Sequence, residues 1–197
     1  MNSTLPLPRR STKRRKPRAS SRRLRSRRRT SITTTAALDA ALLDAAGVRP
    51  GARVLDVGCG RGDTTFDAAS RVGPSGLALG VDASLTVLER ARRRAADAGL
   101  AHLGFVHADP QQQRFAPLRF DSIVSRRARH VFADPDAGFT NLLRALRSGG
   151  RLAVVSSDEA DGVRAVLERV GFVDVSCAAV GARDTAAAWL VSADRRD

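Results

Sequence analysis

Short apolar runs alternate with longer amphipathic segments over most of the chain, from residue 36 onward. Seven runs of five to eight residues, rich in Val, Leu, Ile and Ala, predict β-strands. They cover residues 53–57, 77–81, 103–107, 120–125, 151–156, 172–179 and 187–192. Apolar residues follow one another in these runs without the strict alternation of a half-exposed strand, so we expect a sheet covered on both faces.

The segments between the strands predict helices, and two of these helices have clear ends. Thr35 and Ser84 are candidate N-caps, and Gly47 and Gly99 stop the helices that follow them. The predicted helices cover residues 36–46, 64–71, 84–98, 135–146 and 159–170. Strands and helices alternating at this spacing predict an α/β domain with a mostly parallel sheet.

The first 35 residues differ from the rest in composition, because Arg, Ser, Thr and Pro make up most of them. Thirteen of the 34 basic residues fall within residues 1–30, and the first acidic residue is Asp39. The formal net charge of +14 therefore belongs to this tail, since residues 31–197 hold 21 basic and 20 acidic side chains. A segment this polar cannot bury enough apolar surface to offset the entropy lost on ordering. We predict a disordered tail over residues 1–35 and one folded domain over residues 36–197.

Three interpretations of the tail are open. It is a solvated appendage, or it binds nucleic acid or another anionic surface without sequence specificity through residues 9–29. Alternatively, it comes from translation of an upstream stretch of a GC-rich genome, although Met1 is the only Met of the chain. The nearly neutral remainder excludes a uniformly basic nucleic-acid-binding domain of the ribosomal-protein type.

Cysteine content and hydropathy argue against a disulfide-rich, metal-binding, membrane-spanning or secreted protein. The two cysteines, Cys59 and Cys177, are too few for a disulfide framework and are not spaced as metal ligands. No apolar run approaches the roughly 18 residues of a membrane span, and the N-terminus lacks the apolar region of a secretory signal. We therefore expect a reduced, cytoplasmic protein without a metal site.

The clearest candidate site is the segment VLDVGCGRGD, residues 54–63, where a strand runs into a glycine-rich turn and then a helix. Such a turn lets the backbone approach a ligand at the carboxyl edge of a sheet, although it also fits a tight strand-to-helix connection. A dinucleotide-binding loop would have its third Gly where Asp63 stands. Asp56, just before the turn, would repel a pyrophosphate and attract an ammonium or sulfonium group by ~1–4 kcal/mol. The loop therefore favours a nucleoside ligand that carries a positive charge.

Acidic residues also end the next two predicted strands. Asp82 follows the second strand, 22 residues after Gly60, and Asp109 follows the third. Because the carboxyl ends of parallel strands meet at one edge, we expect Asp56, Asp82 and Asp109 to share one site. Asp82 suits two ribose hydroxyls, as in dinucleotide folds, and a helix cap is its structural alternative.

Five ordered motifs resemble those of class I S-adenosylmethionine-dependent methyltransferases, of the methyltransferase-11-like small-molecule type. They are VLDVGCGRG, GVDAS, HADPQQQRF, RFDSIVSRR and RALRSGGRLAVV, and the resemblance covers residues 36–197. It implies a Rossmann-like three-layer α/β sandwich with a mostly parallel seven-stranded sheet, whose antiparallel last strand lies beside the fifth. It also implies S-adenosylmethionine as the cofactor of a transferase, and methylation of a small molecule as its reaction.

The resemblance also implies which residues contact the cofactor. They are Asp56, Gly58, Cys59, Gly60, Gly62, Asp82, Ala83, Asp109 and Ser125. Asp56 and the glycine loop would hold the methionine part, and Asp82 would bind the ribose hydroxyls. Ala83 would lie against the adenine, and Asp109 would accept a hydrogen bond from its exocyclic amine. Ser125 falls where such enzymes place the methyl transfer.

Methyl transfer from a sulfonium is an in-line displacement, so its catalysis depends mainly on positioning, which is worth roughly 7–11 kcal/mol of the barrier. A general base is needed only where the acceptor is protonated. The sequence assigns no catalytic residue; the candidates are Ser125, His130 and His107.

Three features depart from the family pattern. Pro110 has no N–H to offer the adenine ring, so we expect a lower cofactor affinity unless Gln111 compensates. Arg and His residues at 126–130 replace a usually apolar stretch; we predict a solvated loop, with binding of an anionic acceptor as the functional alternative. Residues 157–158 alone join the fifth strand to the next helix, so we expect an open site.

We therefore expect an S-adenosylmethionine-dependent methyltransferase that acts on a small-molecule acceptor. One alternative is a shortened, catalytically weak relative that binds the cofactor. The other is a nucleic-acid methyltransferase tethered by the basic tail. Against the last, the fourth strand ends in Val124-Ser125-Arg126 and lacks the Asn/Asp-Pro-Pro-aromatic tetrapeptide of many amino-directed nucleic-acid enzymes.

Overall fold

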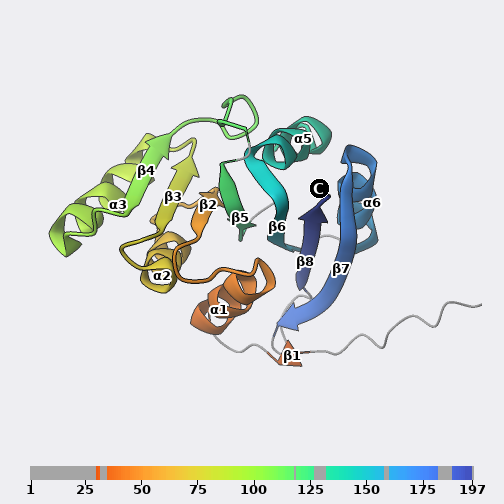
Figure 1. Cartoon of the computed structure of the whole chain (residues 1–197), viewed down its shortest axis with the longest axis horizontal. Helices are drawn as coiled ribbons and strands as arrows, with labels where there is room; N and C mark the ends of the chain where they lie inside the picture. The colour runs from red at the N-terminus through yellow and green to blue at the C-terminus, as the bar shows by residue number, and fades with distance from the viewer. Residues whose placement is uncertain are drawn as a thin grey trace, which may run out of the picture.

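The strands of the computed structural model form one sheet in the order β1-β7-β8-β6-β5-β2-β3-β4 (Figure 1). The structure describes residues 30–31, 35–117, 119–126, 132–157, 160–181 and 188–196. The strands are β1 Thr30–Ser31, β2 Arg53–Val57, β3 Leu77–Asp82, β4 Leu103–His107, β5 Phe120–Ser125, β6 Leu146–Ser156, β7 Phe172–Gly181 and β8 Ala188–Arg195. Only β8 runs antiparallel to its neighbours, β6 and β7, among these strands. The predicted Rossmann-like sheet, with its antiparallel last strand beside the fifth, is confirmed.

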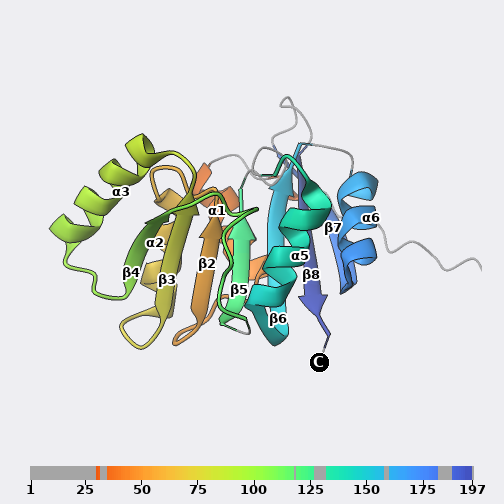
Figure 2. The same cartoon turned by 90° about the horizontal axis from the view of Figure 1, so that it is seen from above.

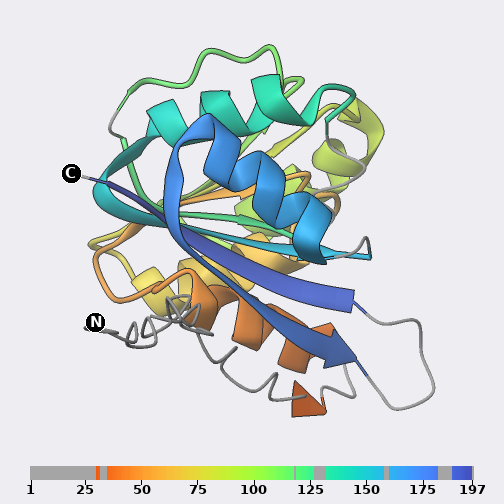
Figure 3. The ribbon, with the colours of Figure 1, turned by 90° about the vertical axis from the view of Figure 1, so that its right-hand side faces the viewer.

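Helices cover both faces of this sheet (Figures 2 and 3). They are α1 Thr35–Ala45, α2 Asp63–Val72, α3 Leu85–Ala98, α5 Pro135–Ala145 and α6 Ala160–Val170. Val54 packs in the layer formed by α1, α2 and α3, whereas the next residue, Leu55, packs in the layer formed by α5 and α6. Because successive strand residues point to opposite faces, the two layers together bury β2 from Val54 to Val57. This burial explains why the central strands are continuously apolar.

Most predicted boundaries lie within two residues of the observed ones, and β6 is the main exception. It begins at Leu146, not at residue 151, because Leu146 pairs with Phe120 across an irregularity in the β5–β6 ladder. The helix before it, α5, accordingly ends at Ala145. Its start follows local rules, since Asp134 accepts a hydrogen bond from the Ala137 N–H at 3.1 Å and Pro135 occupies the first turn.

The sheet contains one strand more than the seven predicted. This additional strand is β1, whose residues fall within the predicted disordered tail. Thr30 and Ser31 pair in parallel with Val180 and Gly181 of β7, so these two residues belong to the edge of the sheet. Residues 1–29 and 32–34 lie outside the described residues, as does the segment 9–29 predicted to bind anions. The predicted division into residues 1–35 and 36–197 therefore stays a prediction, although α1 already begins at Thr35.

Two helical glycines provide a test of core packing. A Cβ atom at Gly138 in α5 would lie less than 3.0 Å from ring carbons of the buried Phe132, whereas a Cβ at Gly162 in α6 would meet nothing within 4 Å. We expect Gly138→Ala to lower the free energy of unfolding by about 1–3 kcal/mol through overpacking. Gly162→Ala is the matched control and should raise it by about 0.5–1 kcal/mol. Urea unfolding checks both values; stabilisation by Gly138→Ala would contradict the described packing.

Candidate functional site

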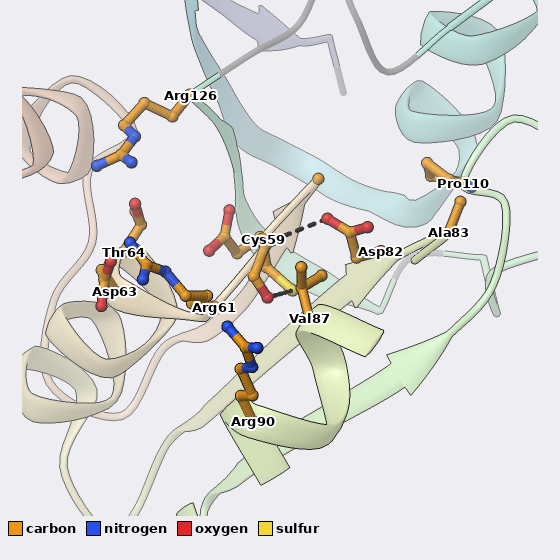
Figure 4. A pocket seen from close by; sticks show the side chains of 13 residues that line it. Cys59, Arg61, Asp63, Thr64, Asp82, Ala83, Val87, Arg90, Pro110 and Arg126 are labelled. Carbon is orange, nitrogen blue, oxygen red and sulfur yellow. Dashed lines mark hydrogen bonds between the residues drawn. The ribbon is translucent and has the colours of Figure 1, made fainter. Parts of the chain in front are cut away.

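A cavity of about 530 Å³ lies at the carboxyl ends of β2 and β3 and next to the end of β5 (Figure 4). Its walls come from the glycine loop after β2, the first turn of α2, the end of β3, the start of α3 and single residues from elsewhere. The lining residues are Asp56, Gly58, Cys59, Gly60, Arg61, Asp63, Thr64, Asp82, Ala83, Val87, Arg90, Pro110 and Arg126. The cavity thus occupies the edge of the sheet at which open α/β folds bind their ligands.

The glycine loop is shaped by backbone geometry and by contact with β3. Gly60 has a φ of +55°, in the left-handed region that side chains disfavour. A Cβ atom at this position would meet nothing within 4 Å, so the backbone conformation, and not a lack of space, favours glycine there. Gly62 has a φ of +86°, and a Cβ would also come within 3.0 Å of the Phe105 ring. The N–H groups of Gly58 and Cys59 both donate to the carbonyl of Val81, at 2.8 and 3.1 Å. The loop is therefore folded back over the end of β3.

Asp82 ties this loop to the helix that follows β3. One carboxylate oxygen accepts from the Gly60 N–H and the other from the Ser84 N–H, each at 2.8 Å. Ser84 occupies the predicted N-cap position of α3, but its side chain makes no capping hydrogen bond. A carboxylate offers about four acceptor positions. Asp82 therefore bridges the two segments and still has capacity for the two hydroxyls of a ribose.

Asp56 is buried beside the loop, with 2% of the residue exposed. Burial raises the pKa of its carboxyl group to about 7, and the nearby Asp39 and Asp82 carboxylates act in the same direction. The Thr65 hydroxyl, which donates to Asp56 at 2.7 Å, and the Arg126 charge oppose this rise. Near neutral pH, Asp56 is thus balanced between its neutral and its ionised form. A cation in the cavity would favour the ionised form.

The sequence did not point to Asp39, which lies in α1 with 2% of the residue exposed. Its carboxylate accepts from the Thr64 hydroxyl at 3.1 Å and from Arg126 Nη1 at 2.9 Å. The available signal was an acidic residue among the apolar positions of a short helix. Arg126 lies in this ion pair with 28% of its side chain exposed, so the prediction of a solvated loop is wrong for this residue. Residues 127–130 of that stretch, including His130, lie outside the described residues.

Asp109 does not line the cavity and is engaged by its own turn. One carboxylate oxygen accepts from the Gln111 N–H at 2.9 Å, and the other from the Gln112 side-chain amide at 2.8 Å. Pro110 does line the cavity. The Gln111 N–H is thus committed to Asp109 and does not replace the missing Pro110 donor. Recognition of the adenine amine by Asp109 remains a prediction.

Ser125 ends β5 next to Arg126 and is 1% exposed. Its hydroxyl oxygen is buried without a hydrogen-bond partner in the described part of the chain, which is unusual for a buried polar atom. Neither Ser125 nor Gly62 is among the cavity-lining residues. His107 is exposed, lies outside the lining, and places its ring Nε2 3.0 Å from the Ala83 carbonyl.

The cavity brings together six of the predicted contact residues: Asp56, Gly58, Cys59, Gly60, Asp82 and Ala83. Their chemistry fits a cationic nucleoside, because Asp82 has free acceptor capacity and because Gly58 and Gly60 line the cavity with backbone alone. Asp56 supplies a carboxyl group whose ionisation a positive charge would favour. The orphaned Ser125 hydroxyl adds an unsatisfied polar group at the same edge.

Such a fold and site define a Rossmann-like domain that receives a nucleoside at the carboxyl edge of its sheet. Residues 49–180 match the sequence model of a family described as “Methyltransferase domain”, well over half of the chain. The chain belongs to this family, and the resemblance to class I S-adenosylmethionine-dependent methyltransferases is confirmed. S-adenosylmethionine is the cofactor of this class.

Two curated relatives and one solved structure illustrate the relationship. The chain is 35% identical over 112 residues to nocamycin O-methyltransferase of Saccharothrix syringae, an alignment that covers 57% of this chain and 40% of that protein. It is 39% identical over 115 residues to the ubiquinone/menaquinone biosynthesis C-methyltransferase UbiE of Ectopseudomonas mendocina, covering 57% and 44%. A SAM-dependent methyltransferase from Aquifex aeolicus shares the fold, with a TM-score of 0.69, 20% identity and coverage of 80% of this chain and 89% of that chain. The matched segment spans less than half the length of the two curated relatives.

The described residues contain neither a candidate membrane span nor a cluster of metal-ligating side chains. None of the helices there combines the length and apolarity that crossing a bilayer requires. Within the same residues, no group of three or more His, Cys, Asp or Glu side chains is arranged to hold a metal ion.

The raised pKa of Asp56 predicts a pH dependence of stability. Between about pH 4 and 7 the unfolded chain has released this proton while the folded protein retains it, so the free energy of unfolding should fall as pH rises through this window. A rise of about 3 pKa units corresponds to at most about 4 kcal/mol. Asp56→Asn should therefore become progressively more stable than the wild type from pH 4 to pH 7.5 in urea unfolding. Parallel stability profiles of the two proteins would contradict this expectation.

Proposed function

We propose that this protein transfers a methyl group from S-adenosylmethionine to a small-molecule acceptor. The observation that carries the proposal is the cavity in which the glycine loop, buried Asp56 and Asp82 meet at the end of adjacent parallel strands. The names of the two curated relatives, an O-methyltransferase and a C-methyltransferase, support the same reaction type.

Asp56, Asp82 and the backbone of the glycine loop have defined tasks in this proposal. When bound, the cofactor supplies an electrophilic methyl group on a sulfonium. Asp82 accepts hydrogen bonds from the ribose hydroxyls while it keeps the Gly60 and Ser84 N–H groups in place. Asp56, once ionised, attracts the positive charge of the methionine part, and the Gly58–Gly62 backbone leaves room for it. These contacts contribute mainly by orienting the methyl group for in-line attack.

In this proposal the side of the cavity that receives the acceptor lacks a long covering segment. Only Ser157 of the connection between β6 and α6 is described, and α6 begins at Ala160, so this connection is too short to form a long cover. No general base is assigned, since Ser125 and His107 lie outside the cavity lining. The relatives favour small-molecule methylation over the two alternatives, a weak cofactor-binding relative and a tail-tethered nucleic-acid enzyme. The cytoplasmic location stays a prediction.

Calorimetric titration of S-adenosylhomocysteine into the full chain tests the proposal. We expect saturable binding that Asp82→Asn weakens about 10-fold or more, because the substitution removes charge-assisted hydrogen bonds to both the ribose and the loop. Asp97→Asn, on the exposed last turn of α3, is the matched control and should leave the affinity unchanged. Absence of saturable binding by the wild-type protein would refute the cofactor site. Binding without methylation of phenolic or carbon acceptors would favour the catalytically weak alternative.

A further inference from the structure

The cavity has two chemically different ends. Three charged residues line it at the ends of three neighbouring strands: Arg126 at the end of β5, Asp56 in β2 and Asp82 in β3. They lie in this order because the strands follow the order β5-β2-β3 in the sheet. Asp82, Ala83 and Pro110 lie together on the β3 side, and Arg126 lies on the opposite side (Figure 4). Asp56 belongs to β2, the strand between β5 and β3 in the sheet. If the nucleoside occupies the Asp82 end, as the proposed function requires, the amino-acid arm of the cofactor extends toward Arg126.

Arg126 is prepared to bind a carboxylate. Asp39 engages the guanidinium only through Nη1, at 2.9 and 3.2 Å, and the Thr64 hydroxyl in turn holds Asp39. Nε and Nη2 make no hydrogen bond to any other residue that the structure describes. A guanidinium has five N–H donors in a rigid plane, which suits the two oxygens of a carboxylate. The ion pair therefore fixes one end of the group and leaves the other end available.

Two further arginines line the cavity, but neither is held in this way. Arg61 in the glycine loop and Arg90 in α3 are exposed, and their guanidinium groups make no hydrogen bond to the described residues. Exposed charges are screened by solvent and lose side-chain freedom when they bind. Arg126 is partly buried and already oriented by a buried partner, so ordering it costs less.

We infer that Arg126, anchored by Asp39 of α1, binds the carboxylate of the cofactor's amino-acid arm. This inference rests on the proposed function, because it presupposes an S-adenosylmethionine-type ligand. The arm carries an ammonium and a carboxylate on one carbon atom, and Asp56 and Arg126 offer the complementary charges side by side. Asp39 acts as the positioning residue through its ion pair, which joins α1 to the end of β5.

A matched pair of ligands isolates the carboxylate. S-adenosylhomocysteine and its decarboxylated analogue both carry the amine, and only the first carries the carboxylate. We expect the wild-type protein to prefer S-adenosylhomocysteine about 10- to 100-fold in calorimetric titration, the size of a charge-assisted hydrogen bond. Arg126→Met should abolish this preference by weakening S-adenosylhomocysteine alone. Arg61→Met and Arg90→Met should leave the ratio of the two affinities unchanged.

A second set of variants guards against loss of folding, because Arg126→Met leaves the buried Asp39 without its counter-ion. Asp39→Asn keeps Arg126 but removes the ion pair that positions it, so it should reduce the preference without abolishing it, whereas Asp39→Asn with Arg126→Met removes both charges and should lose the preference. Retention of the preference in either Arg126→Met protein, or its loss in Arg61→Met, would overturn the inference while leaving the proposed function intact. Failure of the wild-type protein to bind either ligand would overturn both.

Discussion

Removal of the Asp56 carboxyl group from water is the constraint on which the arrangement of the site depends. Desolvation of a carboxylate is costly, and the structure offsets part of this cost with the Thr65 hydroxyl and the charge of Arg126. Arg126 forms an ion pair with Asp39, and Asp39 accepts a hydrogen bond from Thr64. Through these contacts α1, α2 and the end of β5 are all connected to the buried Asp56 carboxyl group. The buried polar residues Asp39, Thr64 and Thr65 are therefore explained by the hydrogen bonds and the ion pair around Asp56 and not by the packing of the core.

The local sequence was sufficient to predict the strand bounds that depend on neighbouring residues in the chain. The bounds of β2, β4 and β5 follow from short apolar runs, which end at the glycine loop, just before Asp109 and at the Arg-rich stretch that begins with Arg126, respectively. The start of β6 could not be predicted in this way, because it depends on pairing with Phe120, 26 positions earlier in the chain. Asp39 was missed for a similar reason: its partner Arg126 is 87 positions away, and an acid in a helix is ordinarily exposed. The hydrogen bonds of the Asp109 carboxylate to its own turn were likewise not predicted from its position at a strand end, and the contact of Asp109 with the adenine stays a prediction.

The two ends of the cavity also differ in how firmly they are built. At the Asp82 end, hydrogen bonds join the glycine loop, β3 and the start of α3 into one unit, so a ribose would meet groups that are already in place. Next to it, Pro110 and the committed Gln111 N–H leave little backbone for hydrogen-bonding the adenine ring. Recognition would thus depend more on the ribose and on the charged arm than on the base. Preformed contacts of this kind lower the entropy lost on binding.

The position of β1 has a consequence for the basic segment that precedes it. Five inter-strand steps separate β1 from β2, which places the point of attachment about 24 Å from the strand that ends at the cavity. A polyanion held by basic residues next to Thr30 would therefore contact the domain at this edge of the sheet and not at the cavity. Selection of the acceptor would then remain with the residues that line the cavity.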